Sequence, residues 1–204
     1  MSMLFLAKAI GTTVAGAYCE TNFLSSFSSS ATLSRSDGTT SVSVSPFFGL
    51  TPLILSGLGF WAFAYGMNVG VARNKAMEAA KKDGEKDVKE RYDLPNLYVQ
   101  GTSKHARVFN CIQRSHQHIF ETYPTIIVTG LIAATQYPIF AAGTTLMYAV
   151  GRISLSNGYA KSDGDASKRY ENSSFARYMW YGVLINLLLS FLSCANIIAG
   201  KKLI

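Results

Sequence analysis

The sequence predicts an all-α protein, an integral-membrane bundle of four helices with an extra N-terminal segment. Of its 204 residues, 49% are hydrophobic and only 15% are charged, whereas soluble domains carry about 25% charged residues. The apolar residues gather into long runs that short charged blocks separate. One run also carries a stripe of polar side chains, which a membrane helix turns toward other helices or a wet cavity.

These runs divide the chain into two parts. Residues 1–46 are expected to form an N-terminal extension, an apolar segment followed by a Ser-rich linker, and residues 47–204 the membrane domain. The apolar segment, residues 3–18, is too short for the ~30 Å hydrocarbon core. We therefore expect an interfacial helix or one packed on a partner. The predicted spans are about 47–72, 106–136, 139–159 and 175–198.

The first span is free of charge and long enough to cross a bilayer with some tilt. A charged block follows it as far as Pro95. Pairs four residues apart, such as Glu78–Lys82, favour continuation of the first helix into water. Gly84 is expected to weaken that continuation and Pro95 to end it. Pro124 is expected to kink the second span.

The net charge of +7 does not indicate nucleic-acid binding, because most basic residues flank the apolar runs. Four spans place the loops after the first and third spans on the same side of the membrane. Both loops are rich in Lys and Arg, so the positive-inside rule predicts that they face the cytosol or the mitochondrial matrix.

The three cysteines, Cys19, Cys111 and Cys194, lack metal-ligand or CxxC spacing, and we expect them to be reduced. No zinc, Walker, Rossmann or Ser–His–Asp pattern is present, so no metal is predicted. The chemistry is expected instead on the polar stripe of the second span. At helical period this stripe, here called the seam, comprises Arg107, Asn110, Arg114, Gln117, His118 and Glu121.

Charged residues at this depth call for an explanation, since one Arg at a bilayer centre costs about 2.5–3.5 kcal/mol. Arg114 and Glu121 are two turns apart and are not expected to neutralise each other easily. A neutral His118 is expected to accept from Arg114, and Arg152 on the third span to pair with Glu121. One interpretation is a polar network that only fixes packing.

The other interpretation is an anion pocket near the basic side of the membrane. Arg73, Arg107, Arg114 and Arg152 would supply positive charge, and Glu121 would receive an ammonium group. Such a pocket fits a zwitterionic small ligand with several negative charges. A channel lined by the seam is less favoured, because only one helix carries a seam.

The second span, with FNCIQRSHQHIFETYP, closely resembles the microsomal glutathione transferase 3-type branch of the MAPEG family, membrane-associated proteins in eicosanoid and glutathione metabolism. Tyr92-Asp93-Leu94-Pro95-Asn96-Leu97-Tyr98 resembles that branch's approach to the helix. Val150-Gly151-Arg152 and Ser167-Lys168-Arg169 match further pieces. The resemblance covers roughly residues 47–198, and residues 1–46 have no recognised counterpart.

The resemblance implies a membrane-bound glutathione transferase or peroxidase acting on lipophilic electrophiles or lipid hydroperoxides. It also implies a homotrimer that binds glutathione, as co-substrate, between neighbouring subunits. An endoplasmic reticulum or a mitochondrial membrane is expected. The alternative is a non-catalytic subunit that keeps the fold within a larger membrane complex, for example a mitochondrial respiratory assembly.

The resemblance also implies the site residues. Arg169 would stabilise the glutathione thiolate as the catalytic residue, with Lys168 as a competing alignment. Two positions depart from the family pattern, since His118 replaces an asparagine and Leu155 replaces a tyrosine. The implied glutathione-binding residues are Arg73, Arg114, His116, His118, Glu121, Arg152 and Tyr159.

Overall fold

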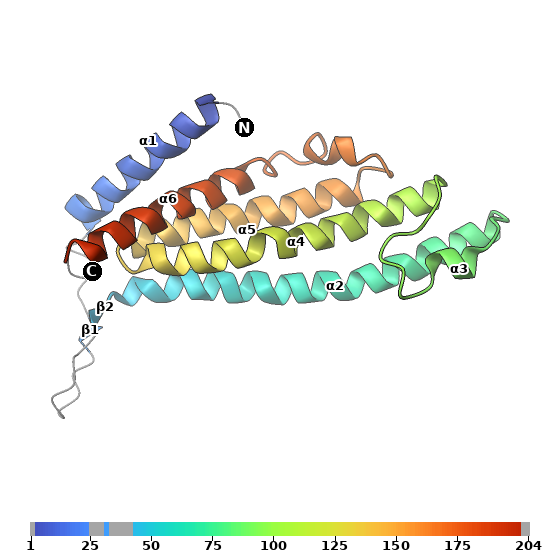
Figure 1. The fold of residues 1–204 in the computed structure, drawn as a ribbon, viewed down its shortest axis with the longest axis horizontal. Coiled ribbons are helices and arrows are strands. Elements are labelled where there is room, and N and C mark those ends of the chain that lie inside the picture. Colours follow the sequence, from blue (N-terminus) through green and yellow to red (C-terminus); the bar gives the residue numbers. More distant parts are fainter. Residues whose placement is uncertain (1–2, 25–30, 33–42, 201–204) are drawn as a thin grey trace. The chain divides into compact units, whose positions relative to one another are not determined.

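The computed structural model describes residues 3–24, 31–32 and 43–200. This part of the chain is almost entirely helical, which confirms the predicted all-α fold (Figure 1). The long helices are α1 (Met3–Cys19), α2 (Leu50–Lys82), α4 (Lys104–Ala134), α5 (Pro138–Ala160) and α6 (Tyr178–Ile198).

The remaining elements are short. They are the π-helix η1 (Glu20–Leu24), the 3-10 helices η3 (Pro46–Gly49) and η4 (Ala166–Tyr170), and the single-turn helix α3 (Val88–Tyr92). The two-residue strands β1 (Ala31–Thr32) and β2 (Ser43–Val44) pair antiparallel. Most of the predicted Ser-rich linker lies outside the described residues.

Helix α2 continues into the charged block and ends ten residues past the predicted end of the first span at residue 72. Glu78 pairs with Lys81, 2.8 Å away, rather than with Lys82. The helix ends at Lys82, and Gly84 follows with a φ of 72°, which glycine adopts without steric cost. Helix α4 runs through Pro124 without a break.

Within the described residues, two helices are long and apolar enough to cross a membrane, Pro46–Lys82 and Tyr178–Ile198. Helices α4 and α5 do not meet that criterion. Helix α4 carries the charged seam, and α5 contains a buried arginine, Arg152.

The helices divide into two compact units, and the boundaries cut across α2, α4 and α5. The first unit takes in Met1–Gly57, Tyr123–Ala149 and Tyr178–Ile204; the second takes in Leu58–Thr122 and Val150–Arg177. The predicted division of the chain at residue 46 stays a prediction.

In the first unit, α1 packs against α6 (Figure 1). The rings of Phe5 and Tyr181 lie 4.1 Å apart, and Gly16 lets the Phe140 ring approach the backbone of α1. The buried Glu20 carboxylate accepts from the backbone N–H groups of Ile139 and Phe140, each at 2.8 Å. The N-terminal segment therefore packs against α6 and against the start of α5.

The second unit has a separate core where α2, α3 and α4 meet. Ala80 of α2, Tyr92 of α3 and Phe109 of α4 are fully buried in it, and α3 lies beside the C-terminal end of α2 (Figure 1). In the same unit, the buried Ser115 of α4 donates to Ser156 of α5 at 3.0 Å. These contacts set the register of α4, which carries the seam, against its neighbours in the second unit.

Replacing Glu20 with Ala is expected to release the N-terminal segment, because two backbone donors at the start of α5 lose their acceptor. One or two such bonds correspond to about 1–3 kcal/mol, so cleavage within residues 3–24 by a protease should become about tenfold faster in detergent. Glu171→Ala, at an exposed position, is the matched control. Unchanged cleavage in Glu20→Ala would show that this contact does not hold the segment.

The same contact should depend on pH. Burial raises the pKa of the Glu20 carboxyl, although the Ile139 and Phe140 N–H donors act in the opposite direction. The folded state thus favours the protonated group. Protection of residues 3–24 should be greatest below the ordinary pKa of glutamate and fall as the pH rises through the raised pKa. Glu20→Ala should remove this dependence.

Candidate functional site

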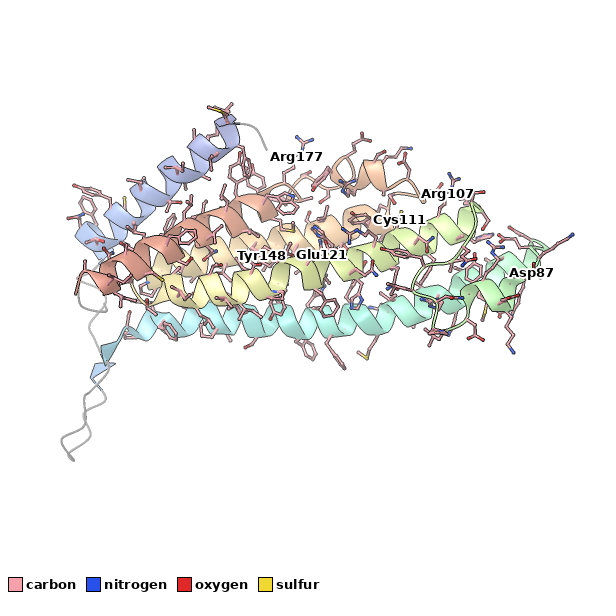
Figure 2. The ribbon with its side chains drawn as sticks, in the orientation of Figure 1. Asp87, Arg107, Cys111, Glu121, Tyr148 and Arg177 are labelled. Atoms are coloured by element: carbon pink, nitrogen blue, oxygen red, sulfur yellow. The ribbon has the colours of Figure 1, made fainter. Side chains whose placement is uncertain are left out.

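The partly exposed face of α4 in the second unit displays a bidentate ion pair. Arg114 Nη2 donates to Glu121 Oε2 at 3.0 Å, and Arg114 Nη1 donates to Glu121 Oε1. Both side chains are half-exposed, at 40% and 49%. Figure 2 labels Glu121, with Arg107 and Cys111 nearer the start of the same helix.

The expectation that Arg114 and Glu121 would not easily neutralise each other is wrong. Seven residues advance a helix by about 10.5 Å but rotate it by only about 20° from two full turns, so both side chains leave the same face. The long arginine side chain extends along the helix and covers that distance. Two fixed donors of a guanidinium match the two oxygens of a carboxylate.

Behind this pair, Arg152 of α5 is fully buried. Its Nη1 lies 2.8 Å from Nδ1 of His118, and its Nη2 donates to the Ser115 carbonyl and, at 3.3 Å, to the Ser115 hydroxyl. Because a guanidinium only donates, His118 Nδ1 must accept, which leaves the imidazole proton on Nε2. The predicted pairings of Arg152 with Glu121 and of Arg114 with His118 are therefore wrong.

Arg169 lies over two aromatic rings in the second unit. Its guanidinium carbon is 5.7 Å from the centre of the Tyr159 ring and 4.7 Å from that of Tyr170. Its Nη1 donates to the Ala166 carbonyl at 2.7 Å. The competing residue, Lys168, instead lies 3.9 Å from Asp165.

Arg169 lies on η4, and hydrogen bonds to Asp165 hold the first turn of this helix. The Asp165 carboxylate accepts from the Ser167 hydroxyl and backbone N–H, and these bonds lower the pKa of that carboxyl. On the other side, the backbone carbonyl of Arg169 approaches Gly158 of α5 so closely that a Cβ at Gly158 would lie 2.0 Å from it. The position of Arg169 therefore depends on a glycine.

Electrostatic contacts join these groups. His118 interacts electrostatically with Arg114, Glu121, Arg152 and Arg169. Arg114 interacts in the same way with Tyr159. We call this set the seam cluster. Its members are Arg114, His118, Glu121, Arg152, Tyr159 and Arg169.

Two of the predicted binding residues lie outside the seam cluster. His116 is two residues from both Arg114 and His118, which turns it to another face of α4. Its ring packs at 5.1 Å from Phe120 and its Nε2 faces Gly66 of α2.

Arg73 holds the segment before α4. It donates to the carbonyls of Tyr92 at 3.0 Å and Leu97 at 3.2 Å, and its guanidinium carbon lies 4.5 Å from the centre of the Phe109 ring. Asn110, a seam residue, bonds both the N–H and the carbonyl of Val99 at 2.9 Å.

A further contact in this region joins the segment before α4 to the seam. Tyr98 donates to Gln117 of the seam. Both residues stand in motifs noted in the sequence, but nothing in their spacing predicted that they would meet. Within the described residues, no three His, Cys, Asp or Glu side chains are placed to hold a metal ion.

Arg73→Ala is expected to loosen the segment 92–97. Hydrogen bonds to charged groups contribute about 1.5–3 kcal/mol, and partial exposure of Arg73 places this case at the low end. Amide hydrogen exchange in 92–97 should therefore become roughly tenfold faster. Lys75→Ala, on the exposed surface of the same helix, should leave it unchanged. Equal exchange in Arg73→Ala and the native protein would contradict the anchoring role.

The described residues form an almost entirely helical fold, and two of its helices are long and apolar enough to cross a membrane. A family model matches residues 51–195, and the chain belongs to the MAPEG family. Members of this family have an all-helical membrane fold, and they include glutathione transferases, glutathione peroxidases and eicosanoid synthases.

Proposed function

We propose that the protein is a membrane-bound glutathione transferase or peroxidase that acts on lipophilic electrophiles or lipid hydroperoxides. The observation that carries the proposal is the Arg114–Glu121 pair, two opposite charges on one accessible helix face. Arg169 interacts electrostatically with His118 of the same helix. The motif on α4 supports the microsomal glutathione transferase 3-type branch. The proposal includes a homotrimer in an endoplasmic reticulum or mitochondrial membrane.

Glutathione carries two carboxylates, one ammonium group and a thiol. In the proposed complex a carboxylate replaces Glu121 at Arg114, and the ammonium group replaces Arg114 at Glu121. Each charge of the pair exchanges one partner of opposite sign for another, so neither is left unpaired when glutathione binds. His118 and Arg152 behind the pair keep this face of α4 in place.

Arg169 supplies the chemistry. A free thiol has a pKa of about 8.5 and is mostly protonated at neutral pH. A guanidinium in contact with the sulfur favours the thiolate, which is the nucleophile. In a transferase the thiolate forms a carbon–sulfur bond as the leaving group departs with its electron pair.

In a peroxidase the thiolate attacks the peroxide and breaks its O–O bond. The lipid leaves as an alcohol after gaining a proton, and the sulfur becomes a sulfenic acid. A second glutathione thiol then displaces water and forms the disulfide. Two thiols are oxidised and one hydroperoxide is reduced, so the electrons balance.

Equilibrium binding of glutathione to the detergent-purified protein tests the proposal. Loss of a charge-assisted bond of about 1.5–3 kcal/mol predicts a Kd raised roughly 10- to 100-fold in Arg114→Ala. Arg177→Ala, a matched change at an exposed arginine outside the seam cluster, should bind like the native protein. Absence of binding to the native protein at millimolar glutathione would reject the proposal.

A second candidate is the non-catalytic subunit of a larger membrane complex. The observation that favours it is that Arg114 and Glu121 neutralise each other while Arg73 and Arg152 are engaged by the protein itself. Purification in mild detergent separates the two candidates. Stoichiometric co-purification of other subunits, together with no glutathione binding, would favour the second.

A further inference from the structure

We propose that α1 is a membrane-spanning helix that crosses the bilayer beside α6, in the same direction as α6, with its outer face against lipid. This differs from the interfacial or partner-bound helix that the sequence alone predicts. The proposal concerns residues of the first unit and is independent of glutathione binding.

The contacts of α1 match its two ends to the two ends of α6. The Phe5 ring lies 4.1 Å from the Tyr181 ring, near the start of α6. At the other end, Glu20 binds the start of α5, and Asn196 near the end of α6 donates to the hydroxyl of Tyr137, just before α5, at 2.8 Å. The same number of residues separates Phe5 from Glu20 as Tyr181 from Asn196. Helix α1 therefore follows α6 from end to end (Figure 1).

The two faces of α1 carry side chains of different size. The face toward the protein carries small buried side chains four residues apart, Ala9, Thr13 and Ala17. The opposite face, here called the outer stripe, carries large apolar side chains at the same spacing that are 38–63% exposed, Leu6, Ile10, Val14 and Tyr18. A helix at a water-exposed surface has its large apolar side chains inward and polar ones outward. Small side chains toward a neighbouring helix and large apolar ones outward are typical of packing within a bilayer.

The threonine hydroxyls of α1 need no water. Thr12 donates to the Lys8 carbonyl at 2.9 Å, and Thr13 donates to the Ala9 carbonyl at 2.8 Å. Both bonds lie within the helix, so these hydroxyls are satisfied even where lipid surrounds them.

The charged and aromatic side chains of α1 lie toward its ends. The exposed Lys8 is about one turn from Phe5, and its long side chain can extend to the headgroups near the start of α6. Near the other end, the rings of Tyr18 and Phe23 lie 6.5 Å apart, and aromatic residues gather at membrane interfaces. Together α1 and η1 form one helical segment, Met3–Leu24, that is roughly 30 Å long. This length matches the hydrocarbon core.

Helix α6 identifies what covers the outer stripe. It is long and apolar enough to cross a membrane, and α1 lies beside it over its length. The outer stripe therefore lies at the depth of the hydrocarbon core when α6 spans the membrane. Contiguous apolar surface of this kind is rarely left to water, and lipid satisfies it without a further protein.

A crossing α1 places its start and the end of α6 on opposite sides of the membrane. The predicted spans from α2 to α6 number four, so they return the chain to the side on which α2 begins. The count is even whether or not the consecutive pair α4 and α5 crosses. Helix α1 adds one crossing. Its start lies beside the start of α6, which follows the basic loop 161–169 and Arg177, so this end faces the cytosol or the mitochondrial matrix.

Sealed microsomes from cells that express the full chain test the sides. One epitope is added ahead of residue 1 and another after residue 204, and a protease is added outside the vesicles. If α1 crosses, the protease removes one epitope and leaves the other intact until detergent opens the vesicles. Two epitopes that are both removed or both protected before detergent is added would overturn the proposal.

Spin labels on the outer stripe show what covers it. The single variants Leu6→Cys, Ile10→Cys, Val14→Cys and Tyr18→Cys are made in a chain whose three native cysteines are replaced by alanine, and each is reconstituted into phosphatidylcholine vesicles. Collisions of the label with oxygen, which concentrates in lipid, are compared with collisions with a water-soluble nickel complex. The oxygen-to-nickel ratio should be several-fold higher at positions 10 and 14 than at positions 6 and 18, because the middle of a crossing helix is deepest.

Two exposed positions calibrate the ratio. Phe191→Cys in α6 should report lipid, and Glu171→Cys in the basic loop should report water. An equal ratio along the outer stripe would indicate a helix in the interface, and a ratio like that of Glu171→Cys at positions 10 and 14 would indicate water. Access to neither reagent would indicate a covering protein. Each of these three results would overturn the proposal, and the epitope test, which keeps the native cysteines, does not depend on the alanine replacements.

Discussion

Gly182→Ala is expected to lower the melting temperature more than any other glycine change in the first unit. A Cβ at this position would lie 2.7 Å from the Tyr148 N atom and 2.8 Å from the Thr144 carbonyl oxygen, both in the backbone of α5. Backbone atoms of a packed helix cannot rotate away as a side chain can. Overpacking of this kind costs about 3 kcal/mol at the upper end, which predicts a fall of roughly 6–12 °C.

Gly143→Ala is the control for this prediction. Gly143 also lies in a helix, but a Cβ there meets nothing within 4 Å. Alanine should therefore bring only its better helix propensity, worth up to about 1 kcal/mol, and raise the melting temperature slightly. If Gly182→Ala and Gly143→Ala melted alike, the close crossing of α5 and α6 would be incorrect.

Gly158→Ala is expected to slow the reaction of bound glutathione strongly while leaving most of the affinity for glutathione intact. A Cβ on Gly158 would lie 2.0 Å from the Arg169 carbonyl oxygen and 3.0 Å from the carbonyl carbon. The backbone of η4 must move, and Arg169 moves with it. Displacing a catalytic group by about 1 Å can reduce the rate about 100-fold, so kcat/KM for a lipophilic electrophile should fall by that order.

The separation of binding from catalysis makes this prediction specific. The Arg114–Glu121 pair lies on α4 and does not include residues of η4, so the Kd of glutathione should change by less than about threefold. A parallel loss of binding and rate would mean that Gly158→Ala disrupts the fold of the second unit. An unchanged rate would mean that the thiolate does not depend on Arg169.

The helices could be predicted because burial and hydrogen bonding in a membrane leave few choices. In a membrane, an apolar run without charges forms a helix because a helix satisfies its own backbone hydrogen bonds. The charged residues that follow the first span have good helix propensity, and α2 continues to Lys82. The helix ends before Gly84, whose positive φ suits glycine, and the expectation that Pro95 would end it is wrong. Residues on one stripe of α4 were also recognisable, because helical period alone places them on one face.

The pairings within the seam could not be predicted from spacing. Spacing gives the distance between two Cα atoms along a helix but not how far an arginine side chain reaches, and so the Arg114–Glu121 pair was missed. The partner of Arg152 depends on the register of α5 against α4, which places it opposite Ser115 and His118. No local pattern encodes that register.

The close approaches at Gly158 and Gly182 were equally hidden. A glycine in a helical run is uninformative until the neighbouring helix is known, because its effect arises from an atom in another segment of the chain. The same holds for Glu20, whose partners lie about 120 residues away at the start of α5. The position of Arg169 and the predicted effects on stability depend on these contacts.

The most direct test of the central claim is ultraviolet difference absorbance of the thiolate at saturating glutathione and neutral pH. The native protein should give a saturable thiolate signal, and Arg169→Ala should lose at least nine-tenths of it while still binding glutathione, since one arginine contact can lower a thiol pKa by one or more units. Arg177→Ala should keep the full signal. A native protein that binds glutathione without a thiolate signal, or an Arg169→Ala signal equal to the native one, would contradict the proposed role of Arg169.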